Sequence, residues 1–204
     1  ISYNNPEVEW FFGPSAVANH WEYQPGTAPA FRVLWDQVND QRFLAYALQV
    51  VGDDNTVYLK KPMSSSELGQ SIRSAEAFLN RMEAYALSGE EGLALTELNA
   101  FRKTRVIGYT DVNLSGQALL DEIRLERRKE LCFEGHRWFD LRRQGMPEIK
   151  HTYKAEKGGA VYEYVLQQGD PMYTLPFPNS VVLQNRALVQ NPSREMGARQ
   201  GEIQ

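Results

Sequence analysis

The segment between Ile123 and Gly145 constrains the fold most, because charged and large apolar side chains alternate along it at helical spacing. Steps of three and four residues return to the same face of a helix. A solvated helix face would not be interleaved with side chains such as Leu131, Phe133 and Trp138. We therefore predict a buried ionic network that holds this helix against its neighbours, formed by Glu126, Arg127, Glu130, Glu134, Arg137 and Asp140.

The alternative is an exposed helix whose surface charges pair in water. The two interpretations differ in where one stripe of the helix faces. This stripe begins apolar and becomes ionic, which favours burial. It consists of Leu120, Ile123, Arg127, Glu130 and Glu134.

Composition excludes several classes of protein. Of the 204 residues, 42% are hydrophobic and 24% charged, which argues against a disordered, collagen-like or coiled-coil chain. The net charge of −4 argues against a general nucleic-acid surface. The single cysteine, Cys132, excludes an internal disulfide framework and a cysteine-based zinc site, and we interpret it as a small core residue. No apolar run approaches the roughly 18 residues needed to span a bilayer. We expect no metal and no cofactor.

Two helices are predicted in the middle of the chain. Ser64 and Glu67 have the spacing of a capping box, and apolar residues including Ile72 follow at helical intervals. Ser88 and Glu91 repeat that spacing before a second helix. Two amphipathic helices joined by a tight turn form an antiparallel hairpin. A third helix, with Ser115 as its candidate cap, is expected over about 117–133. A short helix is expected after Gly135 and a strand over 161–166.

Motifs along the chain resemble those of one family. The run Glu126-Arg127, Glu130-Leu131, Glu134-Gly135, Arg137, Asp140-Leu141 and Arg143 is similar to the ER..EL..EG.R..DL.R motif of SusD/RagB proteins. Other matching segments occur in the family's order: Asp40-x-Arg42, Ile72-Arg73-x-Ala75-Glu76, Leu98-Asn99-x-x-Arg102, Tyr173-x-Leu175-Pro176-Phe177-Pro178 and Gln190-Asn191-Pro192. Two departures are Phe177 in place of the usual Ile, and Ser193-Arg194 in place of Gly-Tyr.

The resemblance implies a mainly α-helical, SusD-like fold. It would be a tetratricopeptide-type hairpin scaffold with irregular loops and short β pieces, and the chain would be the C-terminal portion of a usual family member. We treat it as a single segment with three parts. These are an irregular aromatic-rich part (1–62), a helical scaffold (63–145) and a loop-rich closing part (146–204).

The resemblance also implies a function. SusD/RagB proteins are outer-membrane nutrient-binding lipoproteins of Bacteroidetes that take part in polysaccharide utilisation with a TonB-dependent, SusC-like transporter. We therefore expect non-catalytic capture of a glycan or similar nutrient at the cell surface. Membrane attachment would occur only through an N-terminal lipid anchor that is not present in this chain. No signal-peptide pattern is seen before Ile1.

Candidate ligand-binding residues lie in the aromatic-rich part. Trp21 and Tyr23 offer ring faces for the apolar C–H face of a sugar, and Asn19 and His20 offer partners for its hydroxyls. The alternative is that these aromatic rings fill the core.

Two other functions stay open. One is a helical-repeat scaffold that binds a protein or peptide. The other is a glycoside-active enzyme that uses Glu126, Glu130 and Glu134. Each of these glutamates has arginines within one helical turn, which favour the charged carboxylate and oppose a general acid with a raised pKa.

Overall fold

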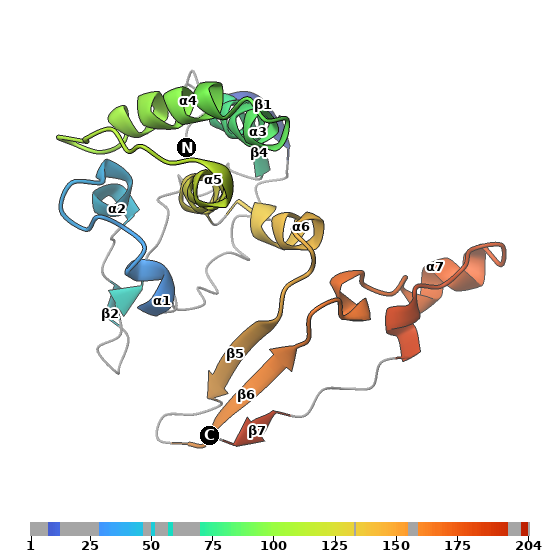
Figure 1. The fold of residues 1–204 in the computed structure, drawn as a ribbon. Helices are drawn as coiled ribbons and strands as arrows, with labels where there is room; N and C mark the ends of the chain where they lie inside the picture. Colours follow the sequence, from blue (N-terminus) through green and yellow to red (C-terminus); the bar gives the residue numbers. More distant parts are fainter. Residues whose placement is uncertain are drawn as a thin grey trace. The chain divides into compact units, whose positions relative to one another are not determined.

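The computed structural model divides the chain into two compact units, residues 1–136 and 137–204. Figure 1 shows their helices and strands. Among the described residues, no helix has both the length and the apolar character needed to cross a membrane. The predicted boundaries after residues 62 and 145 stay predictions. The structure describes residues 8–12, 29–46, 50–51, 57–58, 70–132, 134–154, 159–195 and 201–203.

Three helices form the framework of the first unit: α3 (Ser74–Leu87), α4 (Glu91–Lys103) and α5 (Gly116–Glu130). α3 and α4 form a hairpin, and both contact α5 (Figure 1). The turn of the hairpin contains Gly89 with a φ of +86°, a conformation that glycine adopts without a steric penalty. The predicted mainly α-helical fold with a helical hairpin is confirmed.

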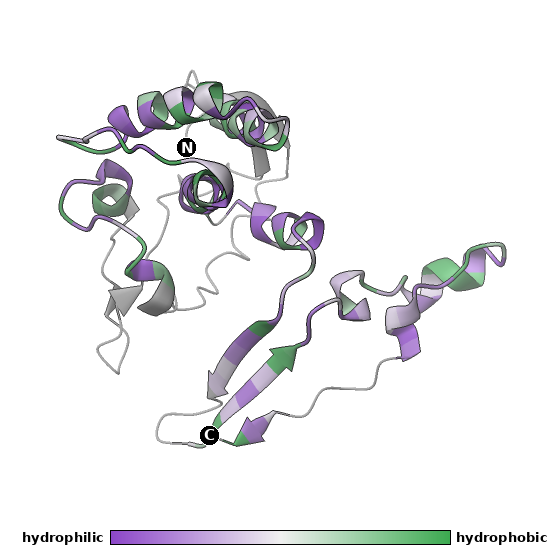
Figure 2. Ribbon diagram, viewed as in Figure 1, coloured by the Kyte–Doolittle hydropathy of each residue, from purple (hydrophilic) through white to green (hydrophobic). Residues whose placement is uncertain are grey.

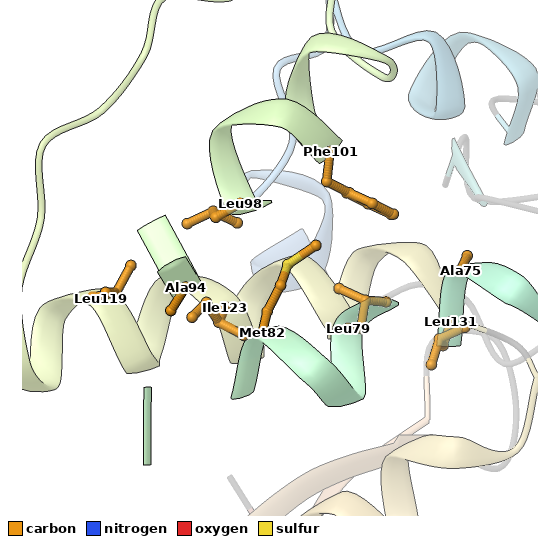
Figure 3. Close-up of a cluster of buried hydrophobic side chains, with 9 residues drawn as sticks. All are labelled: Ala75, Leu79, Met82, Ala94, Leu98, Phe101, Leu119, Ile123 and Leu131. Atoms are coloured by element: carbon orange, nitrogen blue, oxygen red, sulfur yellow. The ribbon is translucent and has the colours of Figure 1, made fainter. Parts of the chain in front are cut away.

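The facing sides of these helices carry the larger apolar cluster of the unit (Figure 3). Leu79 and Met82 of α3, Leu98 of α4, and Leu119 and Ile123 of α5 are 0–1% exposed. Burying one such side chain contributes about 1.5–3 kcal/mol. The hairpin and α5 are therefore held together by this cluster.

The buried stripe of α5 begins one residue earlier than predicted, at Leu119 instead of the half-buried Leu120. Both choices satisfy helical spacing, so packing against α3 and α4 decides between them. The buried residues of α5 are Leu119, Ile123, Glu126, Arg127 and Glu130.

Two short antiparallel strand pairs complete the first unit. β1 (Val8–Phe12) pairs with β4 (Gln70–Arg73), and β2 (Val50–Val51) pairs with β3 (Val57–Tyr58). The prediction that Ile72 lies in a helix is therefore wrong. Its backbone is drawn into a strand by β1, a partner far earlier in the chain that local periodicity does not register.

The capping predictions have different outcomes. Ser64 and Glu67 lie outside the described residues. The prediction that Ser88 caps the second helix is wrong, because its hydroxyl donates a hydrogen bond to the carbonyl of Tyr85 at 3.2 Å and so closes the end of α3. Ser115 precedes α5, but its side chain makes no capping hydrogen bond.

A smaller apolar cluster lies beside two short helices, α1 (Pro29–Arg32) and α2 (Gln41–Tyr46). Trp35 packs against Phe31 in a T-shaped arrangement, with ring centroids 5.8 Å apart. Cys132 is buried in the same cluster, so its predicted role as a core residue is confirmed.

The second unit is built around a three-stranded antiparallel sheet. Its elements are α6 (His136–Arg143), β5 (Ile149–Lys154), β6 (Val161–Leu166), η2 (Pro171–Tyr173), α7 (Asn179–Gln184), η3 (Pro192–Glu195) and β7 (Glu202–Ile203). The strands are ordered β5-β6-β7, so β6 is central (Figure 1). The first residue of α6 belongs to the first unit. The predicted strand over 161–166 is confirmed as β6.

Side chains fix the irregular part of this unit. Trp138 of α6 stacks on the buried Tyr173 at a centroid distance of 4.9 Å, and the Tyr173 hydroxyl donates a hydrogen bond to the carbonyl of Pro147. The Gln190 side chain accepts from the N–H of Phe177 at 2.8 Å and donates to its carbonyl at 3.0 Å. The Gln190 amide thus pairs with both backbone groups of Phe177, as a residue of a neighbouring strand would.

Candidate functional site

A cluster of charged side chains is buried beside the apolar core of the first unit. Figure 2 shows that much of α5 is hydrophilic although this helix packs against α3 and α4. All members except the half-buried Arg105 are 1–8% exposed. Its members, which we call the ion cluster, are Asp40, Arg42, Arg73, Arg102, Arg105, Glu126, Glu130 and Glu134.

Glu130, at the end of α5, is the centre of the ion cluster. It accepts hydrogen bonds from Arg42 Nη1 at 2.9 Å, from Arg73 Nη1 at 3.1 Å and from Arg105 Nε at 3.2 Å. Burial alone would raise the pKa of Glu130, but Arg105, Arg42 and Arg73 lower it to about 2. This carboxylate is therefore ionised at every pH at which the protein would work.

Glu126, one turn earlier on α5, lies between two guanidinium groups. Its Oε2 accepts a hydrogen bond from Arg102 Nε at 2.7 Å. Its Oε1 lies 2.7 Å from Arg42 Nη2 but off the N–H direction, so this contact is an ion pair without a hydrogen bond. Burial opposes ionisation, and Arg42 and Arg102 outweigh it, so the pKa of Glu126 is lowered.

Arg73 joins three parts of the first unit. It ends β4, precedes α3, and binds Glu134 in a two-pronged arrangement, with Nε and Nη2 at 2.9 and 2.7 Å from the two carboxylate oxygens. Its Nη2 also donates to the backbone carbonyl of Glu130 at 3.1 Å. Carbonyls in the last turn of a helix have no partner within the helix, so Arg73 satisfies one of them for α5.

Asp40 precedes α2 and Arg42 lies in its first turn, and the two side chains bind each other in the same two-pronged way, at 3.0 and 2.8 Å. Asp40 Oδ1 also accepts from the backbone N–H of Arg42 at 3.0 Å, which caps α2. The segment containing Asp40 is bridged to Val106, after α4. The ion cluster thus connects α2, β4, α4 and α5.

The remaining predicted members of the network lie elsewhere. Arg127 is buried and donates a hydrogen bond to Asn80 Oδ1 at 2.8 Å, on α3. Asp140 is buried in the second unit and pairs with Arg143 at 3.0 Å. The prediction that Arg137 is buried is wrong, because its side chain is exposed. α5 ends at Glu130, so the stripe of this helix does not reach Arg137.

The sequence did not assign the arginines to the network. Arg42, Arg73 and Arg102 each belong to a separate motif, Asp40-x-Arg42, Ile72-Arg73 or Leu98-Asn99-x-x-Arg102. The occurrence of these arginines in the ordered motifs was the available signal. Their convergence on Glu126, Glu130 and Glu134 is visible only in three dimensions.

The geometry of the ion cluster is that of a structural network. A glycosidase needs one carboxylic acid with a raised pKa. Glu126 and Glu130 have lowered pKa values and are enclosed by arginines. The cluster holds four elements together. Losing one partner of such a buried network leaves an uncompensated charge, so we expect substitutions in it to be poorly tolerated.

The predicted ligand residues Asn19, His20, Trp21 and Tyr23 lie outside the described residues. In the part of the chain that the structure describes, no group of three or more His, Cys, Asp or Glu side chains is placed to hold a metal ion.

A groove of about 380 Å³ opens between α3 and α4. Its apolar lining includes Phe78, Met82 and Phe101. The guanidinium of Arg81 covers the ring of Phe78 at 4.9 Å, and that of Arg105 covers Phe101 at 4.7 Å. Because an arginine already stacks on each ring, the groove suits an apolar side chain of a polypeptide better than a stacked sugar.

Comparisons with known proteins agree on one family. A model described as the SusD family matches residues 53–193. A SusD-like carbohydrate binding protein from Bacteroides vulgatus is 21% identical, with a TM-score of 0.59, and the match covers 92% of this chain and 49% of that one. A SusD superfamily protein from Bacteroides fragilis is 27% identical, with a TM-score of 0.56, covering 78% and 35% respectively. The chain thus spans half or less of the length of these proteins. No curated protein matches the sequence.

Proposed function

The chain belongs to the SusD family, and from this membership we propose that it takes part in non-catalytic capture of a glycan or similar nutrient at the cell surface. Delivery would be to a partner TonB-dependent, SusC-like transporter in the outer membrane. A lipid anchor at the N-terminus of the full-length protein would hold it at that surface. Relatives of known structure in Bacteroides support this location.

One observation carries the proposal. Arginines from three separate motifs meet the carboxylates of Glu126, Glu130 and Glu134. All of these residues except Arg42 lie within the span that the family model matches. The charged groups of the ion cluster therefore bind one another and stabilise the scaffold. Binding by other surfaces fits this arrangement better than catalysis by the cluster.

We assign the stacking role to Trp21 and Tyr23, with Asn19 and His20 as partners for sugar hydroxyls. The test is a screen of the purified chain against immobilised oligosaccharides, followed by calorimetry with the best ligand. Replacing Trp21 and Tyr23 together by Ala should weaken binding about tenfold or more while the melting temperature is kept, because aromatic stacking supplies much of such affinities. Unchanged affinity would reject this site, and the absence of any bound oligosaccharide would reject glycan capture.

A second candidate function is a scaffold that binds a protein or peptide, and the groove between α3 and α4 favours it. Ala100 lines this groove and is exposed, so Ala100→Trp should fill it without disturbing the core. Loss of binding to the purified transporter, with glycan affinity retained, would support the scaffold. Equal transporter binding by the variant and the parent would remove the groove from consideration.

The glycosidase alternative has a direct test. Detectable hydrolysis of any oligosaccharide that is abolished by Glu130→Gln would overturn the non-catalytic proposal. Because Glu130 is enclosed by three guanidinium groups, we expect no hydrolysis in either protein.

A further inference from the structure

The sheet of the second unit has one aromatic face. Side chains of directly paired residues in antiparallel strands share a face of the sheet. His151 pairs with Tyr164, Tyr153 pairs with Tyr162, and Tyr162 also pairs with Ile203 of β7. Tyr162 and Tyr164 are two residues apart on β6, so all of these side chains lie on the same face.

The opposite face has a different chemistry. Thr152 pairs with Glu163, which also pairs with Glu202, so polar and acidic side chains occupy the centre of that face. A sheet in a protein usually buries its apolar face and exposes its polar one. Here the aromatic face is open as well, because Tyr153 is 58% exposed and Ile203 is 70% exposed.

Gly201 determines how one of these rings lies. A Cβ atom at this position would be 2.8 Å from both Cε2 and Cζ of Tyr164, and 2.8 Å from Cβ of Tyr162. A side chain at this position would require the neighbouring atoms to shift. The Tyr164 ring therefore lies across the backbone that leads into β7, in the space that a side chain at Gly201 would occupy, and it is still only half-buried.

We propose that Tyr164, flanked by His151, Tyr153 and Tyr162, is a platform on which a pyranose ring of a glycan stacks. An aromatic face attracts the polarised C–H bonds of a sugar, and a ring laid across the backbone presents its face to the ligand. The phenol hydroxyls and the imidazole offer hydrogen bonds to sugar hydroxyls at the edge of the platform. The inference rests on the proposed function and adds a second binding surface, distant in sequence from Trp21 and Tyr23.

The chemistry of the platform favours a glycan over a charged ligand. The residues of the platform carry no carboxylate, ammonium or guanidinium group. The contrast with the groove between α3 and α4 is direct, because the phenylalanine rings there are covered by arginines. Partly exposed rings with polar edges match a sugar, which is apolar on its faces and polar around its rim.

The test uses the full chain and a panel of maltoheptaose, cellohexaose, xylohexaose and mannohexaose. The oligosaccharide that binds tightest to the parent is titrated by calorimetry into Tyr164→Leu and Tyr164→Phe. Leucine keeps an apolar side chain without a ring, and phenylalanine keeps the ring. We expect Tyr164→Leu to lower the affinity about tenfold and Tyr164→Phe to bind nearly as the parent does.

Two further variants separate stacking from loss of folding. Gly201→Ala keeps every ring but forces Tyr164, and the chain beside Tyr162, to shift, so it should lower the affinity as Tyr164→Leu does. Glu163→Gln alters the opposite face of the same strand and should leave the affinity unchanged. If Tyr164→Leu fails to fold by circular dichroism, Tyr153→Ala replaces it, because Tyr153 is exposed and its removal leaves no cavity.

The outcomes distinguish this inference from the proposed function. Parent-like affinity in Tyr164→Leu and Gly201→Ala, with weakened binding in the variant lacking Trp21 and Tyr23, overturns the platform and leaves glycan capture standing. Binding of none of the panel by the parent overturns the platform for these glycan classes, and glycan capture is then decided by the broader screen. Parent-like glycan affinity in Tyr164→Leu with lost transporter binding overturns the platform in favour of a protein interface.

Discussion

At the scale of single residues, Glu130 illustrates what a buried charge requires. A carboxylate taken out of water is stable only with close, well-directed partners. Arg42, Arg73 and Arg105 supply them from three different parts of the sequence. Exposed pairs such as Arg81 and Glu97 have no comparable requirement, because water solvates either partner if the other is lost.

Glu130→Gln should therefore destabilise the protein strongly. The amide keeps the shape of the side chain but leaves buried guanidinium groups undercompensated, for which we expect a loss of about 3–5 kcal/mol in the free energy of unfolding. Glu97→Gln, in the exposed pair, is the matched control and should cost less than about 1 kcal/mol. Urea unfolding followed by circular dichroism measures both. Equal effects of the two substitutions would contradict burial of the cluster.

The lowered pKa of Glu130 also predicts how stability depends on pH. In the unfolded chain this group has an ordinary pKa of 4.5, and in the folded protein about 2. A folded-state pKa below the unfolded one contributes stability that is present above the unfolded value and is lost as the pH falls through the folded value. The contribution of about 3 kcal/mol should disappear between about pH 5 and pH 2.

Unfolding free energies of the parent and of Glu130→Gln across this pH range test that linkage. The parent should lose more stability on acidification than the variant, because the variant has no group to protonate at this position. Parallel curves would show that Glu130 does not carry the pH dependence.

At the scale of elements, the hairpin of α3 and α4 behaves as one amphipathic unit packed on α5. Its inner face is set by residues such as Leu79 and Leu98, which are fully buried. Its outer face carries exposed residues such as Leu93, at 49% exposure, and the groove that contains Phe78. Apolar spacing alone predicts a helix, but which apolar residue is buried depends on where the neighbouring helix lies.

A pair of Leu→Ala substitutions separates these faces. Leu79→Ala should destabilise the protein by about 2–5 kcal/mol, because it leaves a cavity between the three helices. Leu93→Ala, on an exposed face of α4, should change stability by no more than about 0.5 kcal/mol. The comparison is made by urea unfolding at neutral pH. A large effect at Leu93 would show that this face is covered.

At the scale of the whole molecule, the chain consists of two compact units, and the span that matches the SusD family crosses from one to the other. The first unit holds the helices and the ion cluster, and the second holds the sheet with its aromatic face. Compact units of this kind open as separate cooperative segments in many proteins.

Hydrogen exchange measured by mass spectrometry tests whether the units open separately. Glu130→Gln should speed amide exchange in α3, α4 and α5 and leave exchange in β5 and β6 near that of the parent. This follows because the cluster connects elements of the first unit. Equally accelerated exchange in both units would show that they unfold as one.

Sequence patterns were sufficient for several features. Helical spacing predicted the hairpin and α5, and a separate strand prediction over 161–166 matched β6. The mixture of charge and apolar bulk indicated that Glu126, Glu130 and Glu134 face inward. These features are local, since a side chain's face on a helix follows from its position within a few turns. Ordered motifs predicted the family for the same reason, because each motif is short and contiguous.

Only the tertiary structure decided which charges meet and which local tendencies are overridden. Arg42 and Glu130 are 88 residues apart in sequence, and their attraction depends on a distance through a poorly polarisable interior that no local pattern encodes. The same limit explains Ile72, whose helical spacing yields to strand pairing with β1, and Arg137, whose predicted place on the ionic stripe ends where α5 ends. Periodicity acts over a few residues, whereas ion pairing and strand pairing act across space, and these longer-range interactions determined the ion cluster of the first unit.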